Sequence, residues 1–462
     1  MTTTLVRGLG PVAATAIVVG NVIGTGVFLK SRVMTCNVGT PGRVIAVWVV
    51  AGLLSLAGAL TYAELAAVWP RAGGEYVFIR EGYNSALAFL FGWMRFFVAG
   101  AGALAALAAG LAIFLNVLFR GTLNTIYFTF ELPGLPVPFG ELQVVALVAI
   151  AFVTLINCAS ISVGGRFATA LTALKVGSII ALGLGALIFA SGNWINFLET
   201  GANGSCEGVA AAARGGVAGF VAAMLGALWA YNGWNEMTFV SGEVKNPTRN
   251  IPIALVTGML ICSGLYVFVN STYFYVLTPA EIATVPATSS VAAVVVEKFL
   301  GPLAISLIAA AMLTSTLGAL HISTMANSRI PYALAKDDLF PKSLTKVSER
   351  THIPVRALLA QAVWASVLTL SGSYDTLTDY VIFANWIFFG LVIASVFMIR
   401  KRKPVAEVTY RAWGYPTVPI LFLCTTACLL VVTLVTAPVR SLIGLALVAL
   451  GLPVYYYRSR GN

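Results

Sequence analysis

The chain has 462 residues, of which 59% are hydrophobic and only 10% are charged, whereas about 25% of the residues in a typical soluble domain are charged. This composition excludes an ordinary soluble globular protein and an intrinsically disordered chain. The net charge of +11 would indicate a nucleic-acid partner only if the basic residues clustered on a soluble face, but they lie in short segments between apolar runs.

Apolar runs long enough to cross a hydrocarbon layer of about 30 Å recur from one end of the chain to the other. They lack the alternation of a transmembrane β-barrel, as the run from Leu171 to Ala190 shows. We therefore predict an all-α membrane protein with twelve transmembrane helices. The predicted spans are residues 11–29, 44–69, 86–119, 141–158, 166–190, 214–241, 251–277, 300–328, 355–372, 376–400, 416–435 and 439–458.

The basic residues between these spans predict the orientation of the chain. Of the Lys and Arg residues outside the spans or at their ends, 19 lie on the side that holds both termini and 7 on the other side. Because cytoplasmic loops carry the excess of positive charge, we expect both termini in the cytoplasm. Of the connecting segments, 70–85 is amphipathic and predicts a short interfacial helix at the cytoplasmic mouth, the alternative being a solvated loop. Segment 278–298 has an apolar end that is too short to span, so the segment is expected to lie across the outer face.

Two spans carry breaks near their middle. The first contains GNVIGTGVF from Gly20 to Phe28, and each glycine inside a helix costs roughly 1 kcal/mol relative to alanine. The sixth contains WAYNGWN from Trp229 to Asn235. Close helix packing would explain a single such motif, but two matched breaks beside polar residues indicate an inverted-repeat transporter.

Broken helices offer a particular binding chemistry. Lipid cannot satisfy the N–H and C=O groups that unwinding frees, so they must face protein, water or a ligand. Free N–H groups at the start of a half-helix attract an anion, and free C=O groups at the end of the opposing half attract a cation. An amino acid has both an ammonium and a carboxylate group attached to one carbon, so it matches this pair of binding groups.

Several motifs together resemble the L-amino acid transporter (LAT) family of the amino acid–polyamine–organocation (APC) superfamily, and the similarity runs from about residue 9 to residue 458. Besides the two breaks, they are YAELAAVWPRAGGEYVFIREGY, WAYNGWNEMTFVSGEVKNPTRNIPIA, FANW and GLPVYYY. The resemblance implies the LeuT-like 5+5 inverted repeat and an alternating-access cycle. The repeats would be residues 11–190 and 214–400, followed by two C-terminal helices in 416–458.

The resemblance also implies a substrate site at the two breaks. The carboxylate would bind backbone amides around Gly24, Thr25 and Gly26, and the ammonium would meet carbonyls on both broken helices. Trp229 would close over the substrate from outside, and Asn232 stands where many relatives have glycine. The predicted substrate-binding residues are Val22, Ile23, Gly24, Thr25, Gly26, Trp229, Ala230, Tyr231, Asn232 and Asn385.

Lys175 lies about nine residues into the fifth span, roughly 14 Å deep at 1.5 Å per residue, so its charge requires a reason unless the span boundary is misplaced. The resemblance places Lys175 where sodium-coupled relatives bind a cation between helices 1 and 8. Its ammonium would then bind carbonyls of helix 1 and hydroxyls of helix 8 such as Thr314, Ser315 or Ser323. This argues against sodium coupling and leaves two mechanisms. Either Lys175 gains and loses a proton that drives transport, or it stays charged as a fixed structural cation in an exchanger.

The remaining polar residues suggest no enzyme, metal site or cofactor. Glu64, Arg95, Glu236 and Glu243 lie towards the cytoplasmic side, where they could form an inner gate; for Glu64 and Arg95 we favour static pairing or snorkelling to the interface. His321 and His352 have no second ligand at helical spacing, so neither predicts a metal site.

Among the six cysteines, Cys36 and Cys206 are the two expected in outer loops, where an oxidising exterior permits a disulfide; the alternative is two unpaired thiols. Relatives that pair with a heavy subunit use a cysteine between helices 3 and 4, and residues 120–141 contain none. The resemblance therefore implies no disulfide-linked heavy subunit.

We expect a secondary transporter that exchanges neutral L-amino acids across the plasma membrane, independently of sodium. A proton-coupled symporter is the alternative, and an ion channel is the alternative from a different class. An enzyme is disfavoured because no catalytic constellation converges within the spans.

Overall fold

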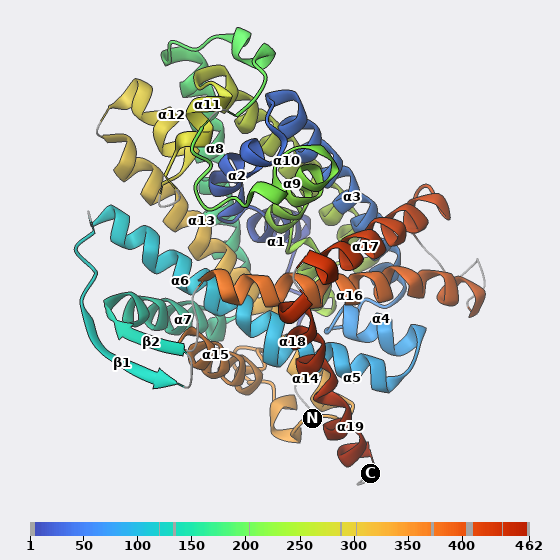
Figure 1. The fold of residues 1–462 in the computed structure, drawn as a ribbon. Helices are drawn as coiled ribbons and strands as arrows, with labels where there is room; N and C mark the ends of the chain where they lie inside the picture. Colours follow the sequence, from blue (N-terminus) through green and yellow to red (C-terminus); the bar gives the residue numbers. More distant parts are fainter. Residues whose placement is uncertain are drawn as a thin grey trace.

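The computed structural model describes residues 5–119, 121–132, 135–202, 204–286, 289–301, 303–370, 374–402, 410–436 and 438–459. Within these residues the protein is a bundle of helices with a single two-stranded hairpin, and both ends of the chain lie at the same end of the molecule (Figure 1). The predicted helical membrane fold is therefore confirmed.

The first half of the bundle begins with a broken helix and ends with a long straight one. Its elements are α1 (Pro11–Val22), α2 (Gly26–Val38), α3 (Pro41–Val68), α4 (Glu75–Gly82), α5 (Ser85–Met94), the π-helical η1 (Arg95–Ala99), α6 (Gly100–Leu118), β1 (Ile126–Leu132), β2 (Leu135–Gly140), α7 (Glu141–Ala159) and α8 (Ile161–Phe189).

The second half has a similar order. Its elements are η2 (Trp194–Leu198), η3 (Ala211–Ala213), α9 (Gly216–Ala230), η4 (Trp234–Glu243), α10 (Pro247–Val276), α11 (Pro279–Thr284), α12 (Val291–Leu300), α13 (Leu303–Asn327), α14 (Arg329–Lys336), η5 (Lys342–Thr345), α15 (Val355–Thr369), α16 (Tyr374–Arg402), α17 (Thr417–Thr436), α18 (Pro438–Ala449) and α19 (Gly451–Ser459).

Nine helical spans in the described residues are long and apolar enough to cross a membrane, and the bent pair α1 and α2 makes ten. Of the twelve predicted spans, 355–372 corresponds to α15, which has only 15 residues. The span predicted at 376–400 lies in α16. The side chains of the first eleven residues of α16, residues 374–384, fall outside the described part. The structure thus agrees with a multi-pass membrane protein.

Local sequence explains where the main helices begin and end. Proline occupies the first turn of α1, α3 and α10, where its missing N–H costs no hydrogen bond. The side chains of Asn84 and Ser160 accept backbone N–H bonds at the starts of α5 and α8. Gly39 ends α2 at a φ of 79°, a conformation that glycine adopts without strain.

Both predicted breaks are present. The first helix leaves α-helical geometry after Val22 and resumes at Gly26, with a bend of 41° between α1 and α2. The second break follows Ala230, and η4 starts after Gly233, whose φ is 109°. These segments lie inside the bundle, where protein groups can satisfy the freed backbone.

Two of the predicted connections differ from expectation, and for a third the structure adds the local fold. Residues 126–140, expected as part of a plain loop, pair as the antiparallel strands β1 and β2. The helix predicted within 70–85 exists as α4, but most of its residues are buried instead of lying on the surface. Segment 278–298 folds as α11 and the start of α12.

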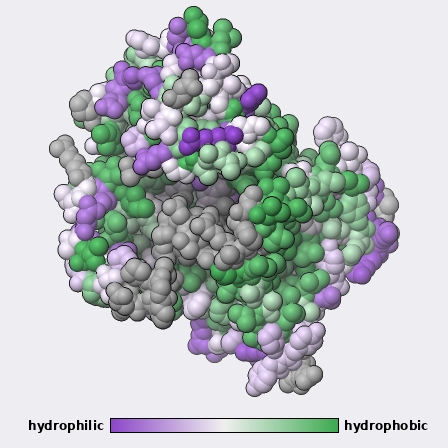
Figure 2. Space-filling view, in the orientation of Figure 1, coloured by the Kyte–Doolittle hydropathy of each residue, from purple (hydrophilic) through white to green (hydrophobic). Residues whose placement is uncertain are grey.

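The surface carries the apolar belt that a membrane requires. In Figure 2 hydrophobic residues dominate the face over α17 and α18, while hydrophilic residues gather at the top, around the segment between α8 and α9. Large exposed apolar side chains include Leu53, Leu155, Phe189, Val217 and Val435. Such a surface is stable when lipid tails cover it.

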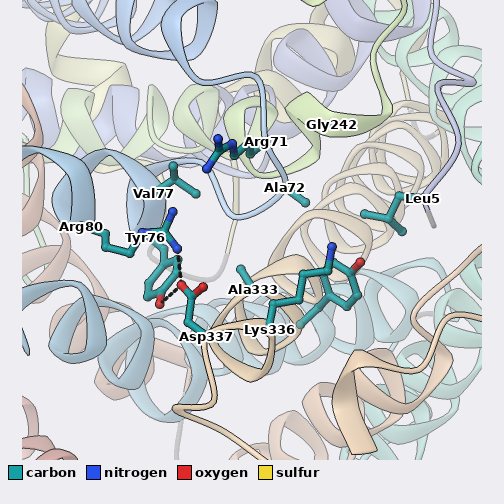
Figure 3. Close-up of a pocket in the computed structure, with 11 residues that line it drawn as sticks. Leu5, Arg71, Ala72, Tyr76, Val77, Arg80, Gly242, Ala333, Lys336 and Asp337 are labelled. Carbon is teal, nitrogen blue, oxygen red and sulfur yellow. Dashed lines mark hydrogen bonds and ion pairs between the residues drawn. The ribbon is translucent and has the colours of Figure 1, made fainter. Parts of the chain in front are cut away.

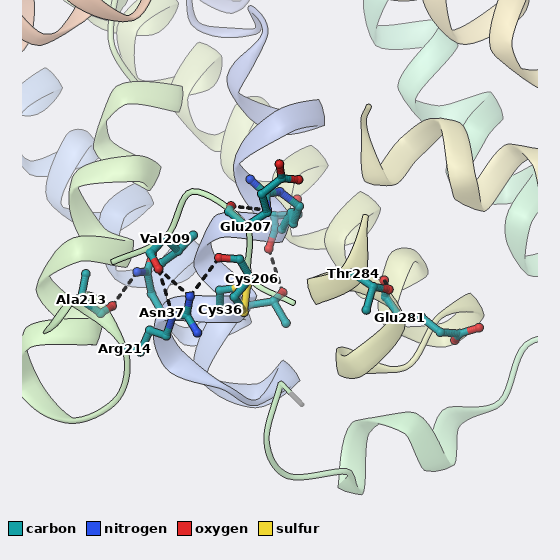
Figure 4. The surroundings of a disulfide bond; sticks show 12 residues. Cys36, Asn37, Cys206, Glu207, Val209, Ala213, Arg214, Glu281 and Thr284 are labelled. Carbon is teal, nitrogen blue, oxygen red and sulfur yellow. Dashed lines mark hydrogen bonds between the residues drawn. A yellow bond between two sulfur atoms is a disulfide. The ribbon is translucent and has the colours of Figure 1, made fainter. Parts of the chain in front are cut away.

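Cys36 and Cys206 form a disulfide, with their Cα atoms 5.7 Å apart (Figure 4). Cys36 lies in the last turn of α2 and not in a loop as expected. Hydrogen bonds surround the bond: the Asn37 side chain donates to the Ala213 carbonyl at 2.6 Å, and Arg214 donates to the Cys206 carbonyl at 3.0 Å. The bond ties the C-terminal end of α2 to the chain that leads into α9.

Peptide mapping of the unreduced protein should recover Cys36 and Cys206 in one cross-linked peptide pair. Cys158, Cys262, Cys424 and Cys428 are free thiols in the structure, so they should alkylate without prior reduction. Recovery of Cys36 and Cys206 as separate alkylated peptides after oxidising purification would contradict the structure.

Candidate functional site

The two breaks meet at a small internal cavity. A Cβ atom on Gly26 would lie 2.5 Å from the Ala230 Cβ and 2.7 Å from its Cα, so the broken helices touch through a position that only glycine fits. The cavity has a volume of about 60 Å³, several times what one water molecule needs. It is lined by Asn21, Val22, Gly24, Thr25, Gly26, Ala103, Leu107, Trp229, Ala230, Asn232, Gly233, Glu236 and Ser323.

The carbonyl groups at the two breaks already accept hydrogen bonds from neighbouring helices. The Tyr266 hydroxyl on α10 lies 2.9 Å from the Val22 carbonyl and 2.8 Å from the Ala230 carbonyl, so it bridges the ends of α1 and α9. Each carbonyl has two lone pairs. The Val22 carbonyl also accepts from the Gly24 amide at 2.9 Å, so the Ala230 carbonyl is the one that keeps a lone pair for a ligand ammonium beside the tyrosine.

Fewer amide groups than predicted are open to an anion. The amide of Gly24 donates to the Val22 carbonyl at 2.9 Å. At the start of α2, Gly26 and Val27 are first-turn residues, whose N–H groups have no acceptor within the helix. The start of α2 is thus the part of this break with the local charge that suits a carboxylate.

Lys175 is completely buried and binds the first break directly. Its ammonium donates to the carbonyls of Gly20 at 2.7 Å, Ile23 at 2.8 Å and Ser315 at 2.8 Å. The predicted partners on helix 1 are therefore present. The expected hydroxyl partners are not: Ser315 offers its carbonyl, while its hydroxyl donates to the Ile23 carbonyl at 2.9 Å.

Glycine on the facing helix makes room for this lysine. A Cβ atom on Gly318 of α13 would lie 3.1 Å from the Lys175 ammonium. The ammonium, α1 and α13 therefore meet at one point, and the positive charge is shared among three backbone dipoles. No acidic residue forms an ion pair with Lys175 in the described part of the chain.

A buried acidic side chain forms the floor of the cavity. Glu236 accepts hydrogen bonds from Asn21 at 2.8 Å and Ser323 at 2.8 Å on one oxygen. Its other oxygen accepts from Arg95 at 2.5 Å and Asn327 at 3.1 Å. Side chains from three helical segments, α1, η1 and α13, thus converge on one carboxylate, and its charge is neutralised by a guanidinium that is 2% exposed.

Arg95→Gln should lower the thermal stability of the purified protein sharply, because it leaves Glu236 as a buried charge without a cationic partner. Breaking a buried pair on one side costs roughly 3–5 kcal/mol. Melting curves in detergent measure the effect, and Arg350→Gln, which removes an exposed charge, is the control. The double variant with Glu236→Gln should be less destabilised than the sum of the two single variants; strict additivity would contradict direct coupling.

Arg95 and Glu64 are both paired, which agrees with static pairing and excludes snorkelling for Arg95. Glu64 accepts two hydrogen bonds from Arg400, at 2.7 and 2.6 Å, and one from the Ala412 amide at 2.6 Å. It therefore fixes α3 to the end of α16 and to the chain that leads into α17. This contact lies away from the cavity.

Two further contacts join segments of the chain at the end of the molecule that holds the termini. Arg329 and Glu243 form a doubly hydrogen-bonded ion pair, at 2.7 and 2.9 Å, that is fully buried. The Leu9 amide donates to the Glu243 carbonyl at 3.0 Å, and the Lys245 amide donates to the Leu9 carbonyl at 2.8 Å. The chain before α1, the end of η4 and the start of α14 are thereby locked together.

Glu75, the first residue of α4, is a buried carboxylate beside the second break. It accepts hydrogen bonds from the Tyr62 hydroxyl and, at 3.0 Å, from the Asn235 side chain. Burial raises its pKa to about 7. Glu75 therefore connects α3 and α4 to the residue that precedes Glu236.

Sequence reasoning identified most of the cavity but not all of it. Ile23, Tyr231 and Asn385 were predicted to bind substrate, yet they do not line the cavity: Ile23 and Tyr231 are completely buried, and Asn385 accepts a hydrogen bond from Arg95 at 3.1 Å. Asn21 and Glu236 were not assigned to the site, although each is a polar residue within a quoted motif. Ser323 was named only as a possible partner of Lys175, and Ala103 and Leu107 come from a helix with no break, so no local signal placed them at the cavity.

His321 is a buried residue whose ring contacts two neighbouring helices. Its ring lies 3.1 Å from the Asn157 side chain and 3.0 Å from the Gly164 carbonyl. It therefore joins α13 to α7 and α8. Within the described residues, no group of three or more His, Cys, Asp or Glu residues could hold a metal ion.

Comparison with known proteins gives one consistent result. A family model described as "Amino acid permease" matches residues 9–451. The chain is 29% identical to the serine/threonine exchanger SteT of Bacillus subtilis, over 98% of this chain and 97% of SteT. It is 29% identical to the human large neutral amino acids transporter small subunit 2, over 98% and 80% of the two chains, and 26% identical to the mouse b(0,+)-type amino acid transporter 1, over 99% and 88%.

Proposed function

The chain belongs to the amino acid permease family, and from this premise we propose that it is a secondary transporter that exchanges neutral L-amino acids across the plasma membrane, independently of sodium. The resemblance to L-amino acid transporters expected from the motifs is confirmed by the relatives above. The observation that carries the proposal is the meeting of two broken helices at one cavity, with amides at the start of α2 and carbonyls at the ends of α1 and α9.

We place each charge of an amino acid on one side of the cavity. The carboxylate lies against the first-turn amides of α2, at Gly26 and Val27. The ammonium lies against the Ala230 carbonyl, whose other lone pair faces the Tyr266 hydroxyl. Trp229 lines the cavity beside them and closes it towards the outside.

The lining of the cavity favours a small side chain. Asn232, Glu236 and Ser323 bring polar groups into a volume of about 60 Å³, and the charge of Glu236 is already balanced by Arg95. A neutral substrate therefore adds no unpaired charge to a buried site. A serine or threonine side chain, which both donates and accepts hydrogen bonds, fits this lining.

Lys175 supports sodium independence. Its ammonium takes the carbonyls of Gly20, Ile23 and Ser315, so a positive charge already lies at the junction of the first break with α13. A metal ion at the same point would face the repulsion of this charge. The structural role of Lys175 is thus that of a fixed cation.

We infer that the transporter works as a single chain with both termini in the cytoplasm. The orientation rests on the excess of basic residues in segments on that side. The single-chain state rests on residues 120–141, which contain no cysteine for a partner and whose described part is largely taken by the β1–β2 hairpin. Residues 11–190 and 214–400 then form the inverted repeats, since each contains one of the two broken helices.

Transport in proteoliposomes tests the function. Labelled serine, alanine, leucine, arginine or glutamate is supplied outside vesicles that are empty or loaded with one unlabelled amino acid. Exchange predicts rapid uptake only into loaded vesicles, with no response to a sodium gradient. Uptake into empty vesicles driven by an inward proton gradient would instead indicate a symporter, and non-saturable uptake would indicate a channel.

A further inference from the structure

A second and larger cavity lies away from the breaks, near the chain before α1. Its volume is about 430 Å³, and segment 71–80, the end of η4 and α14 surround it (Figure 3). Leu5, Val77 and Ala333 give it an apolar wall. The cavity therefore lies between the elements that the Glu243–Arg329 pair and Leu9 lock together.

Positive charge in this cavity exceeds negative charge. Three basic residues line it, Arg71, Arg80 and Lys336, against the single acidic residue Asp337. Asp337 is already engaged, because its carboxylate accepts hydrogen bonds from Arg80 and, at 2.5 Å, from Tyr76. Arg80 is further neutralised by Glu81 at 2.8 Å.

Two basic side chains of the cavity have no acidic partner among the described residues. Arg71 and Lys336 form no ion pair within the described part of the chain, and Figure 3 shows them on different sides of the cavity. The Lys336 ammonium lies 5.2 Å from the centre of the Tyr332 ring, which orients it without neutralising it. An anion between the two would be attracted by both charges.

We propose that this cavity binds a phosphate-bearing anion through Arg71 and Lys336, and that the bound anion holds segment 71–80 against α14. A guanidinium matches phosphate with two parallel hydrogen bonds, and an ammonium adds a compact charge. The apolar wall beside these cations suits the glycerol and upper acyl region of an anionic phospholipid. Basic pockets on the cytoplasmic side of membrane helices bind such headgroups.

The location gives the site a consequence for transport. Gly242 lines the cavity and directly precedes Glu243, whose buried pairing with Arg329 joins η4 to α14. An anion that bridges segment 71–80 and α14 therefore stabilises the arrangement of the same elements. If the anion is a lipid headgroup of the inner leaflet, this end must face the cytoplasm, as proposed above. Binding of a phosphate group to the cavity does not depend on which substrate is transported.

Thermal melting of delipidated protein in detergent tests the site. The probes are phosphatidylglycerol in mixed micelles, zwitterionic phosphatidylcholine as the lipid reference, and inorganic phosphate against chloride at equal ionic strength. We expect one anionic probe to raise the Tm of the unaltered protein by at least about 3 °C over its reference. The double variant Arg71→Gln/Lys336→Gln should lose that shift.

A matched double variant separates the cavity from general charge. Lys346→Gln/Arg350→Gln removes the same charge from exposed positions outside the cavity and should keep the shift. A shift with phosphatidylglycerol alone identifies a lipid headgroup, and a shift with inorganic phosphate identifies a soluble anion. No shift with either probe, or an equal loss in both double variants, would overturn the proposal. The single variants Arg71→Gln and Lys336→Gln give the same comparison if the double variant does not purify.

Discussion

Gly26→Val abolishes amino acid exchange, because a side chain at this position cannot fit between the two broken helices. Even the first carbon would lie 2.5 Å from the Ala230 Cβ and 2.7 Å from its Cα, and backbone cannot move aside as a flexible side chain can. Overpacking of this kind costs roughly 1–3 kcal/mol. Here the cost falls on the contact that brings the amides of α2 opposite the carbonyls of α9.

Exchange in proteoliposomes, together with size-exclusion chromatography, measures this effect. The variant should remain monodisperse, since the clash is local and no charge is removed. Gly177→Ala on α8 is the matched control, because a Cβ atom there meets nothing within 4 Å. Exchange by Gly26→Val at the unaltered rate would refute helix 1 as the binding element.

Lys175→Ala reduces the exchange rate by at least about tenfold, because the ammonium donates hydrogen bonds to three carbonyls at the meeting point of α1 and α13. A hydrogen bond to a charged group contributes roughly 1.5–3 kcal/mol. Without the ammonium, the Gly20 carbonyl loses a donor at the edge of the first break. The apparent affinity for external substrate should change much less, since Lys175 does not line the cavity.

Initial rates over a range of external substrate concentrations separate the two effects, and Lys298→Ala, at a half-exposed side chain, serves as the control. Exchange by the unaltered protein should not respond to sodium. A steep rise of uptake with an inward sodium gradient, or full-rate exchange by Lys175→Ala, would show that the fixed cation has been misassigned.

The sequence was sufficient to predict the breaks, because their signal is local. Glycines at 24 and 26 weaken a helix wherever they occur, and the polar residues beside them indicate that the freed backbone is used. Lys175 was predictable for a similar reason: a charge deep in an apolar run requires a partner, and helix 1 offered carbonyls.

Other parts of the site depend on contacts between residues far apart in the chain. Tyr266 lies in an unbroken helix, and its role appears only when α10 is packed beside the ends of α1 and α9. The π-helical turn that starts at Arg95 has no distinct sequence pattern, yet it belongs to the segment that places the guanidinium against Glu236. The cavity between Arg71 and Lys336 likewise depends on the packing of a loop against α14.

The Cys36–Cys206 bond restricts the mechanics of the transport cycle. It joins the C-terminal end of α2 to the chain that leads into α9, with 5.7 Å between the two Cα atoms, so these two segments stay together at the bond. A path to the outside must therefore open along another edge of this covalently joined pair. The edge facing α6, where Ala103 and Leu107 line the cavity, meets this requirement. We therefore expect α2 and α9 to move together relative to α6 during transport.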